Sequence, residues 1–215
     1  MKTKKLVTTA MLIAVATVLS IFQPFQLPFG GGITIASMMP LILLAFCYGT
    51  SWGLFSAFLF SLLQLLLGAK TVAAFFLPGD SQMILWHALL ICFLDYILAY
   101  STLGLGGLFK NKIKNSTVSI TIGTVFALSL RYIVHIISGA VFFGSWAEWF
   151  FSQDGFYAFG SAILETFSGF SLALIYSVIY NGTYMIPEII ITTILTPIIY
   201  KALSSAKLMN HNSTN

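Results

Sequence analysis

The feature that most constrains this chain is a series of long apolar runs with almost no charge inside them. Hydrophobic residues make up 58% of the 215 residues and charged residues only 7%. A soluble domain carries roughly 25% charged residues. A helix needs about 20 residues to cross the roughly 30 Å hydrocarbon core of a bilayer. The sequence therefore predicts an all-α membrane protein with six transmembrane helices.

The whole chain, residues 1–215, is predicted to be a single integral membrane domain, because six spans with short loops use up its length. The polar stretch 203–215 is predicted to be a disordered cytoplasmic tail. No P-loop, dinucleotide-binding or HExxH pattern occurs. Cys47 and Cys92 lie far apart without metal-ligand spacing and are interpreted as buried thiols. We therefore expect no catalytic site, no metal, no cofactor and no nucleic-acid partner.

The six spans are expected at about 6–22, 33–48, 52–68, 83–109, 118–143 and 172–202. The start of the chain resembles a secretory signal with a cleavage site at 14–16, but the apolar run continues to Phe22, so we expect a retained first helix. Residues 69–82 are expected to form an exposed loop, and the long sixth span is expected to tilt or to break near Pro187. The aromatic-rich segment 144–170 is expected to be an outer loop with a short interfacial helix, which either covers a pocket or has no gating role.

The lysines predict the orientation of the spans. With six spans, most lysines fall on one side, which the positive-inside rule makes cytoplasmic. The N- and C-termini are therefore predicted to be cytoplasmic. The lysines on that side are Lys2, Lys4, Lys5, Lys110, Lys112, Lys114, Lys201 and Lys207.

Polar residues interrupt three of the predicted spans. Asp95 lies in the fourth, Arg131 and His135 lie one turn apart in the fifth, and a stripe of tyrosines ends at Glu188 in the sixth. Ionisable groups are costly in hydrocarbon and are tolerated mainly where they pair or line a cavity. We expect Arg131 to pair with Glu188 and the remaining groups to meet in one pocket. A carboxylate beside aromatic faces and amides fits a flat organic cation.

Three motifs carry a resemblance to a known family: LDY at 94–96, RYIVHIISGAVFF at 131–143 and YSVIYNGTYM at 176–185. They resemble the thiamine-specific S-component (ThiT/YuaJ family) of energy-coupling factor (ECF) vitamin transporters. The resemblance implies a protein of the bacterial cell membrane, with its substrate pocket toward the outer side, that binds extracellular thiamine. It also implies association with a transmembrane coupling subunit and two cytoplasmic ATPase subunits, which supply the energy for uptake.

The resemblance also implies roles for individual residues. Asp95 would contact the substrate with Tyr96 beside it, and His135 would face the thiazolium ring. Phe143 would stand where family members can have a tryptophan that stacks on the pyrimidine. The substrate-binding residues implied in this way are Asp95, Tyr96, His135, Phe143, Tyr176 and Asn181, the last two hydrogen-bonding the aminopyrimidine. Ala10 and Ala14 match the A-x-x-x-A patch that packs on the coupling subunit.

Other functions remain open at this point. The substrate could be a related pyrimidine or another vitamin. The protein could also be an autonomous proton-coupled secondary transporter that uses Asp95 or Glu188 as a proton relay. A third alternative is a membrane enzyme acting on lipid with His135 as general base, but no nucleophile is placed beside a base.

Overall fold

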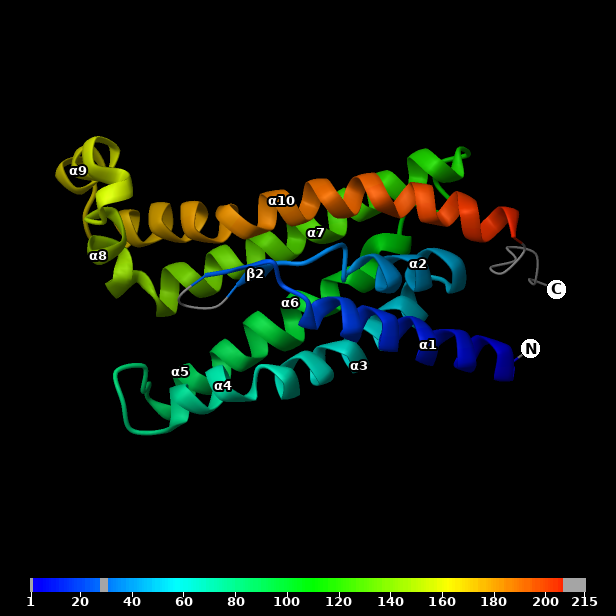
Figure 1. The fold of residues 1–215 in the computed structure, drawn as a ribbon, viewed down its shortest axis with the longest axis horizontal. Coiled ribbons are helices and arrows are strands. Elements are labelled where there is room, and N and C mark those ends of the chain that lie inside the picture. Colours follow the sequence, from blue (N-terminus) through cyan, green and yellow to red (C-terminus); the bar gives the residue numbers. More distant parts are fainter. Residues whose placement is uncertain (1, 28–30, 207–215) are drawn as a thin grey trace.

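The structure is a computed structural model that describes residues 2–27 and 31–206 of the chain. Its helices form an elongated bundle (Figure 1). The N-terminal end of α1 (Lys2–Ile21) and the C-terminal end of α10 (Gly169–Ser205) lie at one end of the bundle. The short helices α8 (Ala147–Phe151) and α9 (Tyr157–Thr166) lie at the other end. The molecule therefore has two chemically different ends, one lysine-rich and one aromatic-rich.

Five helices within the described residues are long and apolar enough to cross a membrane. They are α1, α3 (Thr50–Leu67), the composite helix Leu85–Gly107, α7 (Ser116–Phe142) and α10. The composite helix consists of α5 (Leu85–Ile91), the π-helix η1 (Cys92–Leu98), α6 (Ala99–Ser101) and the 3-10 helix η2 (Thr102–Gly107).

The second predicted span is much shorter than expected. Its helix α2 covers only Met39–Tyr48, ten residues, or about 15 Å at 1.5 Å per residue. The two-stranded hairpin of β1 (Phe25–Gln26) and β2 (Gly32–Ile33) precedes it, with Phe25 paired to Ile33. The first six residues of the predicted span, 33–38, are therefore strand or irregular chain, and the helix that remains is too short to span the hydrocarbon core alone.

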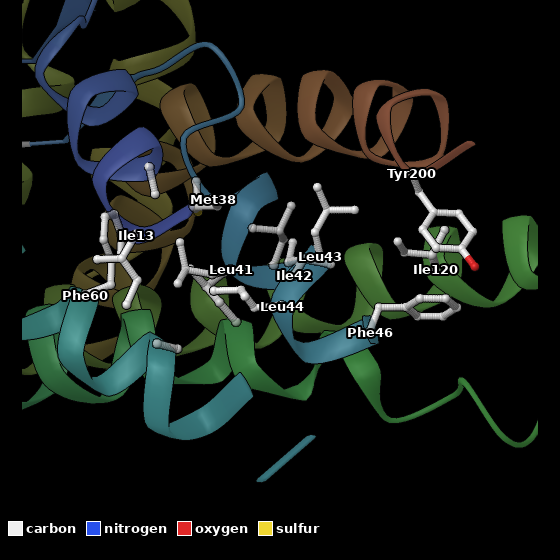
Figure 2. Close-up of a cluster of buried hydrophobic side chains, with 14 residues drawn as sticks. Ile13, Met38, Leu41, Ile42, Leu43, Leu44, Phe46, Phe60, Ile120 and Tyr200 are labelled. Carbon is white, nitrogen blue, oxygen red and sulfur yellow. The ribbon is translucent and has the colours of Figure 1, made fainter. Parts of the chain in front are cut away.

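Helix α2 nevertheless forms the centre of the main hydrophobic core (Figure 2). Residues Leu41 to Phe46 on it are all fully buried. Ile13 of α1, Phe60 of α3, Ile120 of α7 and Tyr200 of α10 contribute side chains to the same cluster. The Phe46 and Tyr200 rings meet edge to face, with centroids 5.1 Å apart. A helix that is apolar on every side is stable only when others surround it, as here.

Glycines allow close helix packing on the far side of this core. A Cβ atom added at Gly123 of α7 would lie 2.1 Å from the carbonyl oxygen of Gly106 in η2. A Cβ atom at Gly53 of α3 would lie 2.9 Å from the carbonyl oxygen of Gly104. Because lipid gives little driving force for helix association, such small-residue contacts contribute much of the packing energy between membrane helices.

Several loop predictions need correction. Residues 69–82 are not all loop, because Ala69–Phe76 form α4. The apolar middle of this segment packs inward: Phe75 is buried, and its ring lies 6.1 Å from that of Phe143. The segment 144–170 contains two helices, α8 and α9, and two 3-10 turns, η3 (Gly144–Trp146) and η4 (Asp154–Phe156), rather than one short helix.

The last helix is longer and more continuous than predicted. α10 runs through both Pro187 and Pro197 without a break. Membrane helices tolerate proline where neighbouring groups satisfy the backbone. The helix also continues to Ser205, so residues 203–205 of the predicted tail are helical. The rest of that tail, 207–215, lies outside the described residues.

Candidate functional site

A large cavity of about 840 Å³ lies between the composite helix, α7, α10 and the β1–β2 hairpin. Residues from α3 and α4 complete its wall. The six residues that the sequence predicted to contact a substrate all border this one cavity: Asp95, Tyr96, His135, Phe143, Tyr176 and Asn181. The predicted convergence of the fourth, fifth and sixth spans on a shared space is therefore observed. Their contact with a substrate stays a prediction.

The π-helix η1 directs Asp95 and Tyr96 toward the cavity. Asp95 and Tyr96 are consecutive, yet both border the cavity, as do Ile91 and Tyr100. The wider π-turn changes the spacing of side chains around the helix, and such turns are frequent at functional sites. Gly68, at the end of α3, leaves room for the phenol, because a Cβ atom there would lie 2.5 Å from the Tyr96 hydroxyl oxygen.

The carboxylate of Asp95 is held by two side chains of α7. His135 Nδ1 lies 2.9 Å from one oxygen, and Ser138 Oγ donates to the other at 2.8 Å. A carboxylate is an acceptor, so the imidazole nitrogen facing it must carry a proton. The Asp95 side chain keeps 21% of its surface exposed, whereas that of His135 keeps 9%. The carboxylate thus remains accessible from the cavity.

Asn181 is the centre of a second hydrogen-bond group that joins α7 to α10. Its amide nitrogen donates to the carbonyl oxygens of His135, at 3.2 Å, and Ser177, at 2.9 Å. Its amide oxygen accepts a hydrogen bond from the Tyr184 hydroxyl at 2.7 Å. Two carbonyl acceptors fix which end of the amide is the nitrogen. The amide oxygen is therefore the group of Asn181 with a lone pair left to offer.

Tyr184 also borders the cavity, although it is not among the site residues predicted from the sequence. It is buried, and its ring lies edge-on to that of His135 with centroids 6.0 Å apart. Gly31 approaches the ring so closely that an added Cβ atom would lie 2.6 Å from it. The tyrosine stripe on the sixth span was the available signal, since Tyr184 lies one turn after Tyr180 and one turn before Glu188.

Other polar lining residues were not predicted as site residues, although Gln64 interrupts the apolar run of the third span as Asp95 interrupts that of the fourth. They make up a polar rim on α1, the hairpin, α3 and α4: Ser20, Gln23, Gln26, Gln64, Lys70 and Thr71.

The predicted pairing of Arg131 with Glu188 is wrong. Within the described part of the chain, Asp95 with His135 is the one ion pair within 4.0 Å. Arg131 instead points Nη1 at the Met38 sulfur, 2.6 Å away, and lies 4.3 Å from the centroid of the Tyr100 ring. The Glu188 carboxylate accepts hydrogen bonds from the Thr34 backbone and hydroxyl instead. The Thr34 backbone N–H and hydroxyl thus make the hydrogen bonds to Glu188 that were predicted for Arg131.

The site has the features of a binding pocket rather than a reaction centre. Ser138 is fully buried and donates to Asp95, not to His135, so it is not a nucleophile activated by a base. Among residues 2–27 and 31–206, no group of three or more histidines, cysteines or carboxylates is placed to hold a metal. Carboxylate, imidazole, amide and aromatic groups together can bind a planar organic cation.

The predicted partner-facing residues lie away from this cavity. Ala10 and Ala14 are exposed on α1, whereas Ile13 and Ala16 of the same helix are buried in the core. One face of α1 therefore packs on the protein and another, lined with small side chains, is open.

Comparison with known proteins agrees with these observations. A family model described as thiamine transporter protein (Thia_YuaJ) matches residues 6–208. The thiamine transporter ThiT of Bacillus subtilis (strain 168) is 31% identical over 207 residues, which cover 91% of this chain and 90% of that protein. The solved structure of ThiT from Listeria monocytogenes has a TM-score of 0.64 at 23% identity and covers 95% of this chain and 96% of that one. That structural match supports the fold.

Proposed function

Because the chain belongs to the thiamine transporter protein (Thia_YuaJ) family, we propose that it captures extracellular thiamine for uptake by an ECF-type importer. Membership of this family makes the chain a multi-pass cell-membrane transporter and not an enzyme. In this proposal the chain is the S-component, which binds the vitamin, and partner subunits supply the energy.

The observation that carries the proposal is the convergence of an acid, an imidazole, an amide and aromatic rings on one cavity of about 840 Å³. Thiamine combines a positively charged thiazolium ring with an aminopyrimidine ring. Asp95 offers the cation a carboxylate in a setting where water screens charge poorly, so the attraction is stronger than it would be in bulk water. The tyrosines and Phe143 offer flat faces for the rings.

The family roles assign each part of the substrate to a wall of the cavity. The thiazolium ring would lie against the hydrogen-bonded pair of Asp95 and His135, with Tyr96 beside it. The pyrimidine would stack on Phe143 and form hydrogen bonds with Tyr176 and Asn181. The buried amide oxygen of Asn181 is suited to accept from an exocyclic amine, because its amide nitrogen is already committed to carbonyl oxygens.

The membrane topology in this proposal has six crossings with both termini cytoplasmic. The five long helices supply five crossings, and the hairpin, the linker 34–38 and α2 together supply the sixth. The N-terminal end of α1 and the C-terminal end of α10 lie at the same end of the bundle (Figure 1), as an even number of crossings requires. The cavity would open toward the outer side, on which the α8–α9 segment also lies. Residues 1–215 would form one membrane domain.

The partners in this proposal are a transmembrane coupling subunit and two cytoplasmic ATPase subunits. Ala10 and Ala14 would form the contact with the coupling subunit, because their small side chains are exposed and let another helix approach closely.

The proton-coupled alternative has less support. Glu188 does not border the cavity, and its carboxylate is held by Thr34.

The proposal is tested by calorimetric titration of the purified full chain in detergent. The probes are thiamine, its mono- and diphosphates, and its isolated aminopyrimidine half. Saturable binding of thiamine that is tighter than binding of the pyrimidine half supports the proposal. No binding of thiamine, or tighter binding of the pyrimidine half, overturns it. Uptake by the chain alone in liposomes under a pH gradient would favour the secondary transporter instead.

A further inference from the structure

Ser138 on α7 makes an unusual hydrogen bond for a hydroxyl in a membrane helix. Its Oγ donates across to Asp95 Oδ2 of η1 at 2.8 Å. Hydroxyls in helices commonly bond back to a carbonyl of their own helix. Thr121 and Thr124 of α7 do this, donating to the carbonyl oxygens of Thr117 and Ile120. Ser138 is fully buried, yet its hydroxyl is directed to a neighbouring helix.

Ser138 and His135 act on the same carboxylate from the same helix face, three residues apart. His135 holds Oδ1 and Ser138 holds Oδ2, so both oxygens of Asp95 have a donor. Hydrogen bonds to a carboxylate are shorter and stronger than those between neutral groups. They also fix its rotamer, so that little reorganisation is needed when a cation arrives.

Ser138 does not itself border the cavity. Whatever it contributes to ligand binding must therefore pass through Asp95, which does.

We propose that Ser138 is a positioning residue for cation recognition, which holds the Asp95 carboxylate directed into the cavity. The inference rests on the proposed function, because it assumes that the ligand of Asp95 is the positively charged ring of thiamine. In this inference, Ser138 makes the site prefer charged over uncharged ligands, and its role is not a general contribution to packing.

The test compares two ligands in Ser138→Ala. One is thiamine, and the other is an uncharged analogue in which a thiophene ring replaces the thiazolium ring. Loss of one charge-assisted hydrogen bond should weaken thiamine binding about tenfold. The neutral analogue should change by less than about twofold, because it gains little from the charge on Asp95. Dissociation constants come from calorimetry on the full chain in detergent.

Ser119→Ala is the matched control, because Ser119 is also fully buried on α7 and its hydroxyl has no hydrogen-bond partner in the described structure. It should leave both affinities unchanged. Ser138→Thr keeps the donor and should restore the preference for the cation. If Ser138→Ala does not fold, Ser138→Cys, a weaker donor of similar size, takes its place in the comparison.

The outcomes separate the inference from the function on which it rests. If the wild-type chain does not bind thiamine, the proposed function fails. If it binds thiamine but Ser138→Ala weakens both ligands equally, or neither, Ser138 is a packing residue and the inference is overturned. In the double variant with Asp95→Asn, removal of Ser138 should have little further effect on thiamine. A full additional loss would also overturn the inference.

Discussion

Glu188 on α10 accepts two hydrogen bonds from Thr34, a residue 154 positions earlier in the chain. One comes from the backbone nitrogen at 2.7 Å and one from the hydroxyl at 2.6 Å. Glu188 is only 1% exposed. The contact fastens the linker between the hairpin and α2 to the last helix. It therefore secures the one part of the fold in which the chain crosses the bundle without a long helix.

Substitution of Glu188 should destabilise the fold in a graded way. Glu188→Met removes both acceptors and leaves the buried Thr34 backbone N–H without a partner, whereas the Thr34 hydroxyl keeps Ser37 Oγ as an acceptor at 2.8 Å. The expected cost is about 2 kcal/mol in unfolding free energy. Glu188→Gln keeps one acceptor and should cost about 1 kcal/mol. Thermal unfolding in detergent measures both. Glu165→Gln, on an exposed residue of α9, is the control. Equal stability of the Met and Gln variants would contradict this reading of the contact.

Asp95→Asn should weaken thiamine binding and spare the fold. An amide can still accept from Ser138 and remain in the π-helical turn, but it offers the thiazolium ring no negative charge. The expected loss in affinity is about 10- to 100-fold, the range for a charged hydrogen-bonding partner in a poorly hydrated site. Calorimetry measures it. Asp80→Asn, on the exposed turn after α4, should bind as the wild type does. An unchanged affinity of the Asp95 variant would remove Asp95 from the site.

Gly139→Ala tests how closely α7 and α10 must approach beside the cavity. An added Cβ atom would lie 2.2 Å from Ser177 Oγ and 3.0 Å from Asn181 Nδ2. Alanine is favoured over glycine in a helix by about 1 kcal/mol, but overpacking costs about 1–3 kcal/mol. Because Asn181 would also have to move, we expect a clear loss of thiamine affinity with a smaller loss of stability. Gly155→Ala, with nothing within 4 Å of the new atom, should change neither. A variant that melts and binds like the wild type would contradict this.

The convergence of the polar residues could be predicted from the sequence for a simple physical reason. Asp95, His135 and Asn181 each interrupt an apolar run, and the cost of exposing them to lipid leaves few arrangements other than a shared cavity or mutual pairing. Their meeting place follows from that cost and from the order of the helices along the chain. The family resemblance then gave Phe143, which apolar composition alone does not distinguish from lipid-facing aromatics.

Features that depend on local geometry or on competing partners could not be predicted. The π-turn that turns both Asp95 and Tyr96 toward the cavity has no sequence signature. Arg131 and Glu188 were paired by charge, but the Thr34 backbone offered Glu188 a nearer donor. The late start of α2 could not be predicted, because apolar residues also occur in the linker before it. The pattern of a single sequence shows which residues are polar. It does not show which of several possible donors will bond to a given acceptor.

Ala14→Leu tests the proposed contact with the coupling subunit. Ala14 is exposed on α1 and distant from the cavity residues, so thiamine binding by the purified chain should not change. A bulkier side chain would hold an approaching helix away. Uptake in proteoliposomes that contain the coupling and ATPase subunits should therefore fall about tenfold or more, which corresponds to about 1.4 kcal/mol or more of lost contact energy. Val15→Phe adds bulk to an exposed position about 100° further round the same helix and should transport normally. Normal uptake by the Ala14 variant, or equal losses in both variants, would show that the small-residue face does not form that contact.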